Sequence, residues 1–159
     1  MAQRLGQVLI DRGLITATQL ELALRNQLSL GGHLGTSLLE LGMVDEKHLG
    51  KILADTLQVP YAGPKMFRRV PVAVVRALPK RVVAEYRAVP FRGRGKTLDV
   101  AMINPSDLPA IDALAFASGC KISPWVSPEV RIFEAMDKLY DIPREIRYIV
   151  ISRSLGPGG

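Results

Sequence analysis

The chain has few of the side chains on which metal sites and many enzymes depend. Cys120 is its single cysteine, and His33 and His48 are its only two histidines. An intramolecular disulfide and a multi-cysteine metal site are therefore excluded, and few histidines are available for catalysis. We expect a protein that is not an enzyme and that needs no cofactor or metal ion.

Long hydrophobic runs are also missing. No uninterrupted apolar run reaches the ~18–20 residues needed to span a bilayer. The N-terminal segment MAQRLGQVLIDRG carries charged side chains where a signal peptide requires an apolar stretch. A hydrophobic content of 48% with 23% charged residues is typical of a soluble globular protein. The sequence thus predicts a cytoplasmic protein without direct membrane insertion.

Acidic residues are scarce in the middle of the chain. Residues 65–96 contain ten lysines and arginines but one acid, Glu85, in a chain of net charge +6. Such a segment could face nucleic acid, an anionic membrane surface, an acidic partner or a phosphorylated ligand, or it could neutralise the acidic flanks. Aromatic residues make up only 6% of the chain, so platforms for stacking single-stranded bases are mostly absent. Nucleic-acid binding is therefore disfavoured.

The first sixty residues contain an internal repeat with an offset of 29 residues. Each copy predicts a helix that ends at a glycine, followed by a tight turn and a second helix. Thr16 with Gln19 forms a capping-box pattern, and Asp45 takes the same place in the second copy. The identical pairs are Leu5/Leu34, Gly6/Gly35, Leu9/Leu38, Gly13/Gly42, Leu20/Leu49 and Leu24/Leu53.

The rest of the chain predicts a β-β-α-β-α order after two short helices within residues 72–86. We predict an α+β fold in which a four-helix unit, made of two repeated helical hairpins, precedes a small α/β subdomain. The predicted boundaries are 1–61, 62–140 and a partly flexible extension, 141–159, with a frayed tail from Gly156. The predicted strands and longer helices are Arg87–Phe91, Leu98–Ile103, about Leu108–Ser118, Lys121–Val126 and Pro128–Tyr140.

One end of each hairpin combines features of an anion site. Arg4 opens the first helix of copy one and Gln27 closes the second, so both reach the same end. Gly6 lies in a first helical turn, where backbone N–H groups lack intrahelical partners. These features fit an anion site, and they also fit plain helix packing in which glycine lies where two helices touch.

The repeated segment, RLG-x-x-L-I-x-x-G-L-I-x-x-x-x-L-x-x-x-L-x-x-Q followed by a five-residue spacer and a near-copy, resembles the tandem motif of the MshEN-type domain. The first copy matches at every defining position. The second departs at His33, where a basic residue is more usual, and at Thr56, where glutamine is usual. MshEN-type domains form the N-terminal part of many type II secretion and type IV pilus assembly ATPases, whose ATPase domain lies downstream, and they bind cyclic di-GMP.

The resemblance implies a cyclic di-GMP site along the two motif copies. Arginine or histidine would meet guanine or phosphate, glycines would let backbone amides approach the phosphates, leucines would pack on the purines, and glutamine would bind a base edge. The implied ligand-binding residues are Arg4, Leu5, Gly6, Leu20, Leu24, Gln27, His33, Leu34, Gly35, Leu49, Leu53 and, from the other subdomain, Asp107.

Three functions remain open at this point, of which nucleic-acid binding through residues 65–96 ranks a distant third. The first is a regulatory cyclic di-GMP-binding module. The second is a protein-interaction adaptor that docks onto type II secretion or type IV pilus machinery and whose nucleotide site has degenerated. The departures from the motif at His33 and Thr56 favour this second function. The implied partners are the secretion or pilus ATPase and inner-membrane platform proteins.

Overall fold

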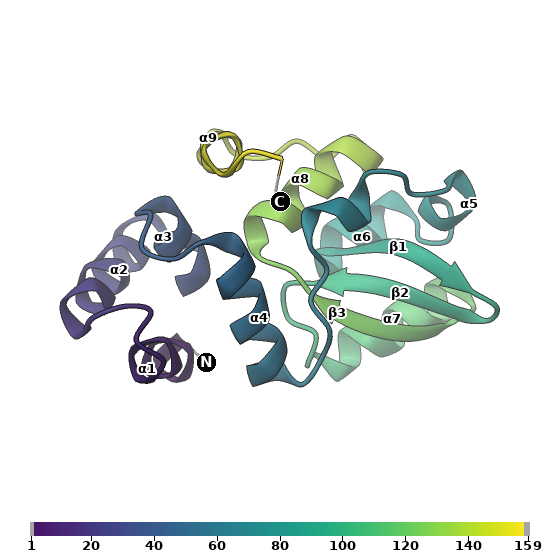
Figure 1. The fold of residues 1–159 in the computed structure, drawn as a ribbon. Helices are drawn as coiled ribbons and strands as arrows, with labels where there is room; N and C mark the ends of the chain where they lie inside the picture. Colours follow the sequence, from purple (N-terminus) through teal and green to yellow (C-terminus); the bar gives the residue numbers. More distant parts are fainter. Residues whose placement is uncertain (1, 158–159) are drawn as a thin grey trace.

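The N-terminal part of the chain consists of four helices, as the repeat predicts. The computed structural model describes residues 2–157, with side chains from residue 4. Within the described part of residues 4–57 no strand occurs. Copy one forms α1 and α2 and copy two forms α3 and α4, seen in purple to blue in Figure 1. Their bounds are Ala2–Asp11, Ala17–Leu30, Leu34–Glu40 and Glu46–Leu57.

Local signals fix the ends of these helices. Thr16 and Gln19 form a reciprocal capping box at the start of α2, with N···O distances of 3.1 and 2.9 Å. The Asp45 carboxylate accepts a hydrogen bond from the His48 amide at 2.8 Å and caps α4. Gly13 and Gly42 take φ values of +72° and +68°, a region that glycine enters at no steric cost. Both helical hairpins therefore turn where the sequence predicts.

The second part of the chain contains a mixed three-stranded sheet, which confirms the predicted α+β class. Strand β1 pairs with β2 antiparallel, and β2 pairs with β3 parallel. Ala88, Met102 and Val126 lie in one row across the sheet. The start of β1 therefore shares an edge with the carboxyl ends of β2 and β3. The strands span Ala88–Arg94, Thr97–Met102 and Lys121–Val126.

Helices surround this sheet. The connection from α4 passes through a 3-10 turn, η1, and the short helices α5 and α6, and α7 crosses over between β2 and β3. In Figure 1, α6 and α7 lie behind the sheet. The Tyr61 ring packs on Gly50, and Tyr61 bridges to Val126, so α4 is docked beside β3. The bounds are η1 Pro64–Phe67, α5 Val72–Val75, α6 Lys80–Tyr86 and α7 Leu108–Ser118.

Two further helices end the chain. Helix α8, Glu129–Tyr140, follows β3 as predicted, and α9, Ile146–Leu155, lies in the segment for which the sequence predicts no element. The Gly156 carbonyl accepts a hydrogen bond from Arg131 at 2.7 Å, so the start of the predicted frayed tail is held. Gly158 and Gly159 of that tail lie outside the described residues.

The described residues form two hydrophobic cores. One is built on the sheet, and the other joins the four N-terminal helices to α8 and α9. Val130 of α8 and Tyr148 and Ile151 of α9 belong to the N-terminal core, where they are at most 6% exposed. The helical repeat is thus completed by the C-terminal helices. None of the described helices has the length and apolar character needed to cross a membrane.

Candidate functional site

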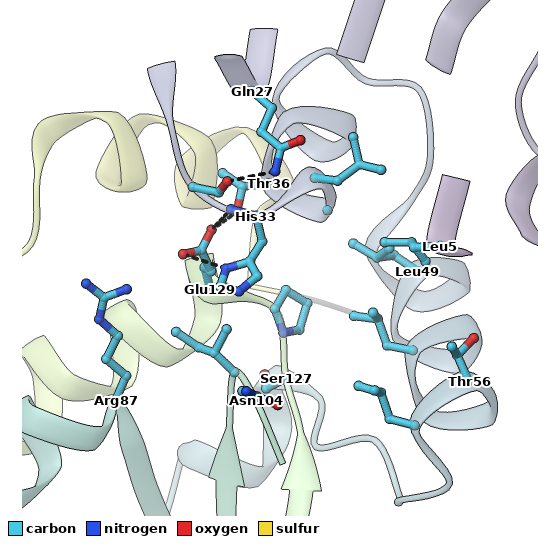
Figure 2. A pocket seen from close by; sticks show the side chains of 17 residues that line it. Leu5, Gln27, His33, Thr36, Leu49, Thr56, Arg87, Asn104, Ser127 and Glu129 are labelled. Atoms are coloured by element: carbon cyan, nitrogen blue, oxygen red, sulfur yellow. Dashed lines mark hydrogen bonds and ion pairs between the residues drawn. The ribbon is translucent and has the colours of Figure 1, made fainter. Parts of the chain in front are cut away.

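A pocket of about 470 Å³ lies between the second copy of the repeat and the shared edge of the sheet (Figure 2). Helical residues form one side and residues that flank the strands form the other. The helical side is lined by Leu5, Gln27, Gly32, His33, Leu34, Gly35, Thr36, Leu49, Leu53, Thr56 and Leu57. The sheet side is lined by Arg87, Ile103, Asn104, Ser127, Pro128 and Glu129.

The structure brings part of the predicted site together. The predicted residues that line the pocket are Leu5, Gln27, His33, Leu34, Gly35, Leu49 and Leu53. All except Leu5 and Gln27 belong to the second copy. Arg4, Gly6, Leu20, Leu24 and Asp107 do not line it. The pocket therefore belongs mainly to the second copy.

The residues away from the pocket have structural surroundings of their own. A Cβ atom on Gly6 would lie 2.7 Å from Leu20 Cδ1, so these two residues mark a close contact between α1 and α2. Asp107 accepts a hydrogen bond from the Ala110 amide at 3.1 Å and caps α7. Arg4 and Leu24 are exposed. Gly6 therefore lies where two helices touch, as expected if this glycine serves helix packing.

An ion pair between His33 and Glu129 lines the pocket. His33 Nδ1 lies 3.0 Å from Glu129 Oε2, as Figure 2 shows. The backbone amide of His33 donates to Glu129 Oε1 at 2.6 Å, and the Thr36 hydroxyl donates to the same oxygen at 2.8 Å. Glu129 is only 3% exposed. Both oxygens of this buried carboxylate are therefore engaged by groups of the second copy.

These contacts favour the charged forms of both His33 and Glu129. The hydrogen bond with Glu129 raises the pKa of His33 above its ordinary 6.5, and it outweighs the opposing effect of desolvation. Burial by itself would raise the pKa of Glu129, but the hydrogen bonds from His33 and Thr36 outweigh burial and lower that pKa to about 2. The pair is thus stabilised as imidazolium and carboxylate.

The sheet side contributes residues that the sequence reasoning missed. Arg87 ends α6 with φ +50°, and its guanidinium carbon lies 5.4 Å from the centre of the Phe133 ring. Ser127 is 1% exposed, and its hydroxyl has no hydrogen-bond partner among the described residues. The β-α-β order could have indicated them, because it implies parallel strands whose carboxyl ends form a common ligand-binding edge.

Part of the basic segment has an internal role. Arg92 Nε lies 2.6 Å and Arg94 Nη2 lies 2.8 Å from the carboxylate of Asp99, which is fully buried. The two arginine side chains are 44% and 57% exposed. Burial alone would raise the pKa of Asp99, yet the two arginines hold it below its ordinary value. These arginines therefore neutralise a buried acid.

No metal site accompanies the pocket. Across the part of the chain that the structure describes, no group of three or more histidine, cysteine, aspartate or glutamate side chains is placed to hold a metal ion. The arrangement offers an apolar wall, an ion pair, a separate arginine and uncharged polar groups, which is the composition of a ligand-binding pocket.

The fold and sequence match a known domain. The MshEN domain matches residues 57–146, more than half of the chain. The chain belongs to the MshEN domain family. The solved structure of MshE with cdg, the abbreviation of cyclic di-GMP, is 32% identical with a TM-score of 0.63, over 86% of this chain and 98% of that one. The N-terminal domain of XpsE shares the fold, at 24% identity and a TM-score of 0.59, over 86% of this chain and 93% of that one.

Longer proteins also contain regions similar to this MshEN domain. The type IV pilus assembly ATPase PilB of Myxococcus xanthus is 35% identical over 140 residues, which are 88% of this chain and 25% of PilB. PilB of Thermus thermophilus is 27% identical over 87% of this chain and 16% of its own length. Bacteriophage adsorption protein B of Escherichia coli K12 is 30% identical over 74% of this chain and 16% of its own length.

The chain thus spans a quarter or less of the length of these curated relatives. The similarity to the pilus ATPases covers only that share of their length. The predicted family and the prediction of a non-enzymatic domain both agree with this match.

Proposed function

We propose that this MshEN domain is a regulatory module that binds cyclic di-GMP in the pocket between the second motif copy and the sheet edge. The observation that carries the proposal is the convergence of seven motif residues on one pocket that the sheet side completes with polar groups. The similar structure of MshE with cdg supports the same ligand class.

The helical wall suits a purine. Leu49 is fully buried, and with Leu5 and Leu53 it lines an apolar side of the pocket. Gln27 donates from Nε2 to the Gly32 carbonyl at 3.1 Å, which leaves its Oε1 available to accept from a guanine N–H group. Base faces would contact leucine and a base edge would meet the amide.

The proposed partners follow from the relatives. Two of them are type IV pilus assembly ATPases. We propose that the module acts on a secretion or pilus ATPase, or on inner-membrane platform proteins, in response to the nucleotide. Its place of action would be the cytoplasm, as the sequence predicts.

Isothermal titration with cyclic di-GMP tests the proposal, and the repeat supplies a matched control. Leu53→Asn removes an apolar contact from the pocket wall, whereas Leu24→Asn changes the equivalent residue of copy one outside the pocket. Burial of a leucine side chain is worth about 1.5–3 kcal/mol, so Leu53→Asn should weaken binding by about tenfold or more. Leu24→Asn should leave affinity within about twofold. An affinity of Leu53→Asn equal to that of the wild-type would refute this pocket as the site.

Arg4→Ala separates two placements of the ligand. If cyclic di-GMP extends along both copies, as the resemblance implies, loss of a charge-assisted hydrogen bond should weaken binding by about ten- to a hundredfold. If the ligand is confined to the pocket, which Arg4 does not line, the affinity should change by less than about twofold.

A second candidate function is the adaptor with a degenerate nucleotide site. It is favoured by the His33 imidazole, which is engaged by Glu129 at 3.0 Å. The double variant His33→Arg, Thr56→Gln restores the fuller motif and should tighten binding if the departures weaken the site. Failure of both the wild-type and the double variant to bind at high micromolar cyclic di-GMP would reject the receptor in favour of the adaptor.

A further inference from the structure

The cation that is available to a ligand in the pocket comes from the sheet side. Arg87 is exposed and lies over the Phe133 ring, and none of the ion pairs among the described residues includes it. Arg92 and Arg94 of the same basic segment differ, because both pair with Asp99. The acid of the pocket, Glu129, has both oxygens engaged by the second copy. Arg87 therefore brings a positive charge to the pocket that the protein itself does not pair.

The backbone at Arg87 is unusual for this residue type. Its φ of +50° and ψ of +53° lie in the left-handed region, at the end of α6. Glycine and asparagine enter this region more readily than arginine, so the fold alone would favour either of them. Gln58 and Asp141 take the same conformation at the ends of α4 and α8. Local backbone preference thus does not explain why position 87 holds an arginine.

A buried hydroxyl lies at the same edge of the sheet. Ser127 follows β3, its amide donates to the Met102 carbonyl at the end of β2, and its Oγ has no partner among the described residues. A buried hydroxyl without a partner is costly, and a ligand oxygen in the pocket would satisfy it. Asn104, which follows β2, lines the pocket beside it (Figure 2).

The register of the sheet brings these groups to one place. Ala88, Met102 and Val126 share a row, so Arg87 and Ser127 both lie just beyond it at the same edge. Helix α8, of 12 residues, begins at Glu129 directly after this edge. A helix N-terminus carries partial positive charge and favours an anion. Arg87 and Ser127 therefore line the sheet side of the same pocket, at which α8 also begins.

We infer that Arg87 and Ser127 bind a phosphate group of the nucleotide, so that the sheet edge recognises the phosphodiester while the repeat recognises the bases. The inference rests on the proposed function and assigns the phosphate contact to residues outside the repeated motif. The guanidinium can donate two parallel hydrogen bonds to phosphate oxygens, and the hydroxyl can donate a third.

Arg87→Asn is the sharpest test, because asparagine suits the left-handed backbone and removes the charge. The variant should keep or raise the thermal stability of the wild-type while its affinity for cyclic di-GMP falls by about ten- to a hundredfold. Arg87→Lys should recover part of the affinity, and Ser127→Ala should lower it a few-fold. Arg81→Gln, in the same basic segment but outside the pocket, is the matched control and should bind like the wild-type.

The outcomes separate this inference from the proposed function. If the wild-type binds cyclic di-GMP and Arg87→Asn binds within twofold of it, the phosphate site is overturned and the proposed function stands. If the wild-type does not bind cyclic di-GMP, the proposed function fails, and inorganic pyrophosphate decides the anion site. Pyrophosphate should then shift the amide NMR signals of Ser127 and Val130 in the wild-type but not in Arg87→Asn, and no shift in the wild-type would overturn it.

Discussion

The two copies of the repeat share leucines and glycines but differ in what covers them. In α3 every residue from Leu34 to Leu39 is buried, whereas in the equivalent helix α1 only Leu5, Gly6 and Leu9 are buried among the residues with described side chains. Copy two packs against α8 and β3, and copy one packs against copy two through α1 and α2. Similar local sequences thus produce the same order of helices, while the neighbours decide which copy forms a pocket.

Charged contacts accentuate this difference. Glu40 and Glu46 of copy two pair with Arg147 and Arg131, whose side chains are 15% and 1% exposed. The equivalent positions of copy one are Asp11, which accepts from Gln7 on the surface, and Ala17. A buried ion pair, Glu46–Arg131, and a partly buried one, Glu40–Arg147, therefore fix the second copy in place, and its variants should have the larger effects.

Arg131→Ala should have the largest effect on folding. Arg131 donates to both oxygens of Glu46, at 2.6 and 2.8 Å, and its loss leaves a buried carboxylate without its partner. We expect the free energy of unfolding to fall by about 3–5 kcal/mol, measured by denaturant titration. Arg12→Ala breaks an exposed pair with Asp55 in which both side chains are about half exposed, and it should cost at most ~1 kcal/mol. Similar costs for the two variants would contradict the difference between the copies.

Truncation of equivalent leucines gives the next largest effect. Leu49→Ala empties a fully buried position and should lower the unfolding free energy by about 2–5 kcal/mol. Leu20→Ala removes its half-buried counterpart from a site that solvent can fill, so we expect a cost of roughly 1 kcal/mol. Thermal unfolding of both variants under one condition measures the difference, and a larger loss in Leu20→Ala would reverse the comparison.

The ion pair of His33 predicts a pH dependence. Its raised pKa means that its contribution to stability is complete below pH 6.5 and is lost as the pH rises through the raised value. The Glu129 contribution is complete above about pH 4.5 and is lost as the pH falls towards 2. Because His33 is 59% exposed, we expect wild-type stability to decline by at most ~1 kcal/mol between pH 6.5 and 8.5.

Variants of His33 and its counterpart check this decline. His33→Gln should abolish it in urea titrations at several pH values, because glutamine does not titrate. Arg4→Gln changes the equivalent residue of copy one, outside the ion pair with Glu129, and should keep the wild-type slope. A slope that survives in His33→Gln would assign the decline to another group.

The paired glycines should show the smallest effects. A Cβ on Gly35 would lie 3.2 Å from Leu49 Cδ2, and Leu49 is fully buried. A Cβ on Gly6 would lie closer, 2.7 Å from Leu20 Cδ1, but the half-buried Leu20 can shift. Alanine is intrinsically better than glycine in a helix by about 1 kcal/mol. We therefore expect Gly6→Ala to be near neutral and Gly35→Ala to be destabilising by roughly 1 kcal/mol in thermal unfolding. A more harmful Gly6→Ala would show that Leu20 is as constrained as Leu49.

Elements with local signals could be predicted from the sequence. The capping box at Thr16, the cap at Asp45 and the turn glycines determine the ends of the four helices. The strand Lys121–Val126 and the helix Leu108–Ser118 have the predicted bounds because Asp107 and Gly119 cap that helix.

The pocket and α9 depend on contacts that the sequence does not mark. Both copies carry the same leucines, so their pattern does not reveal which copy faces the sheet. Helix α9 starts at Glu145 without a side-chain cap. Its inward residues Tyr148, Ile151 and Ser152 do have helical spacing, and that spacing could have indicated an amphipathic helix.

The closure of the N-terminal core by α9 has a consequence for folding during synthesis. Leu34 leaves the ribosome long before Tyr148, the residue that packs into the same core. At about 5–20 residues per second, the delay between the two is roughly 6–20 s. During that interval the repeat exposes the apolar face that α8 and α9 will cover. The first part of the chain to be made is therefore among the last to become fully protected, and nascent chains should be most prone to aggregation and chaperone binding before α9 emerges.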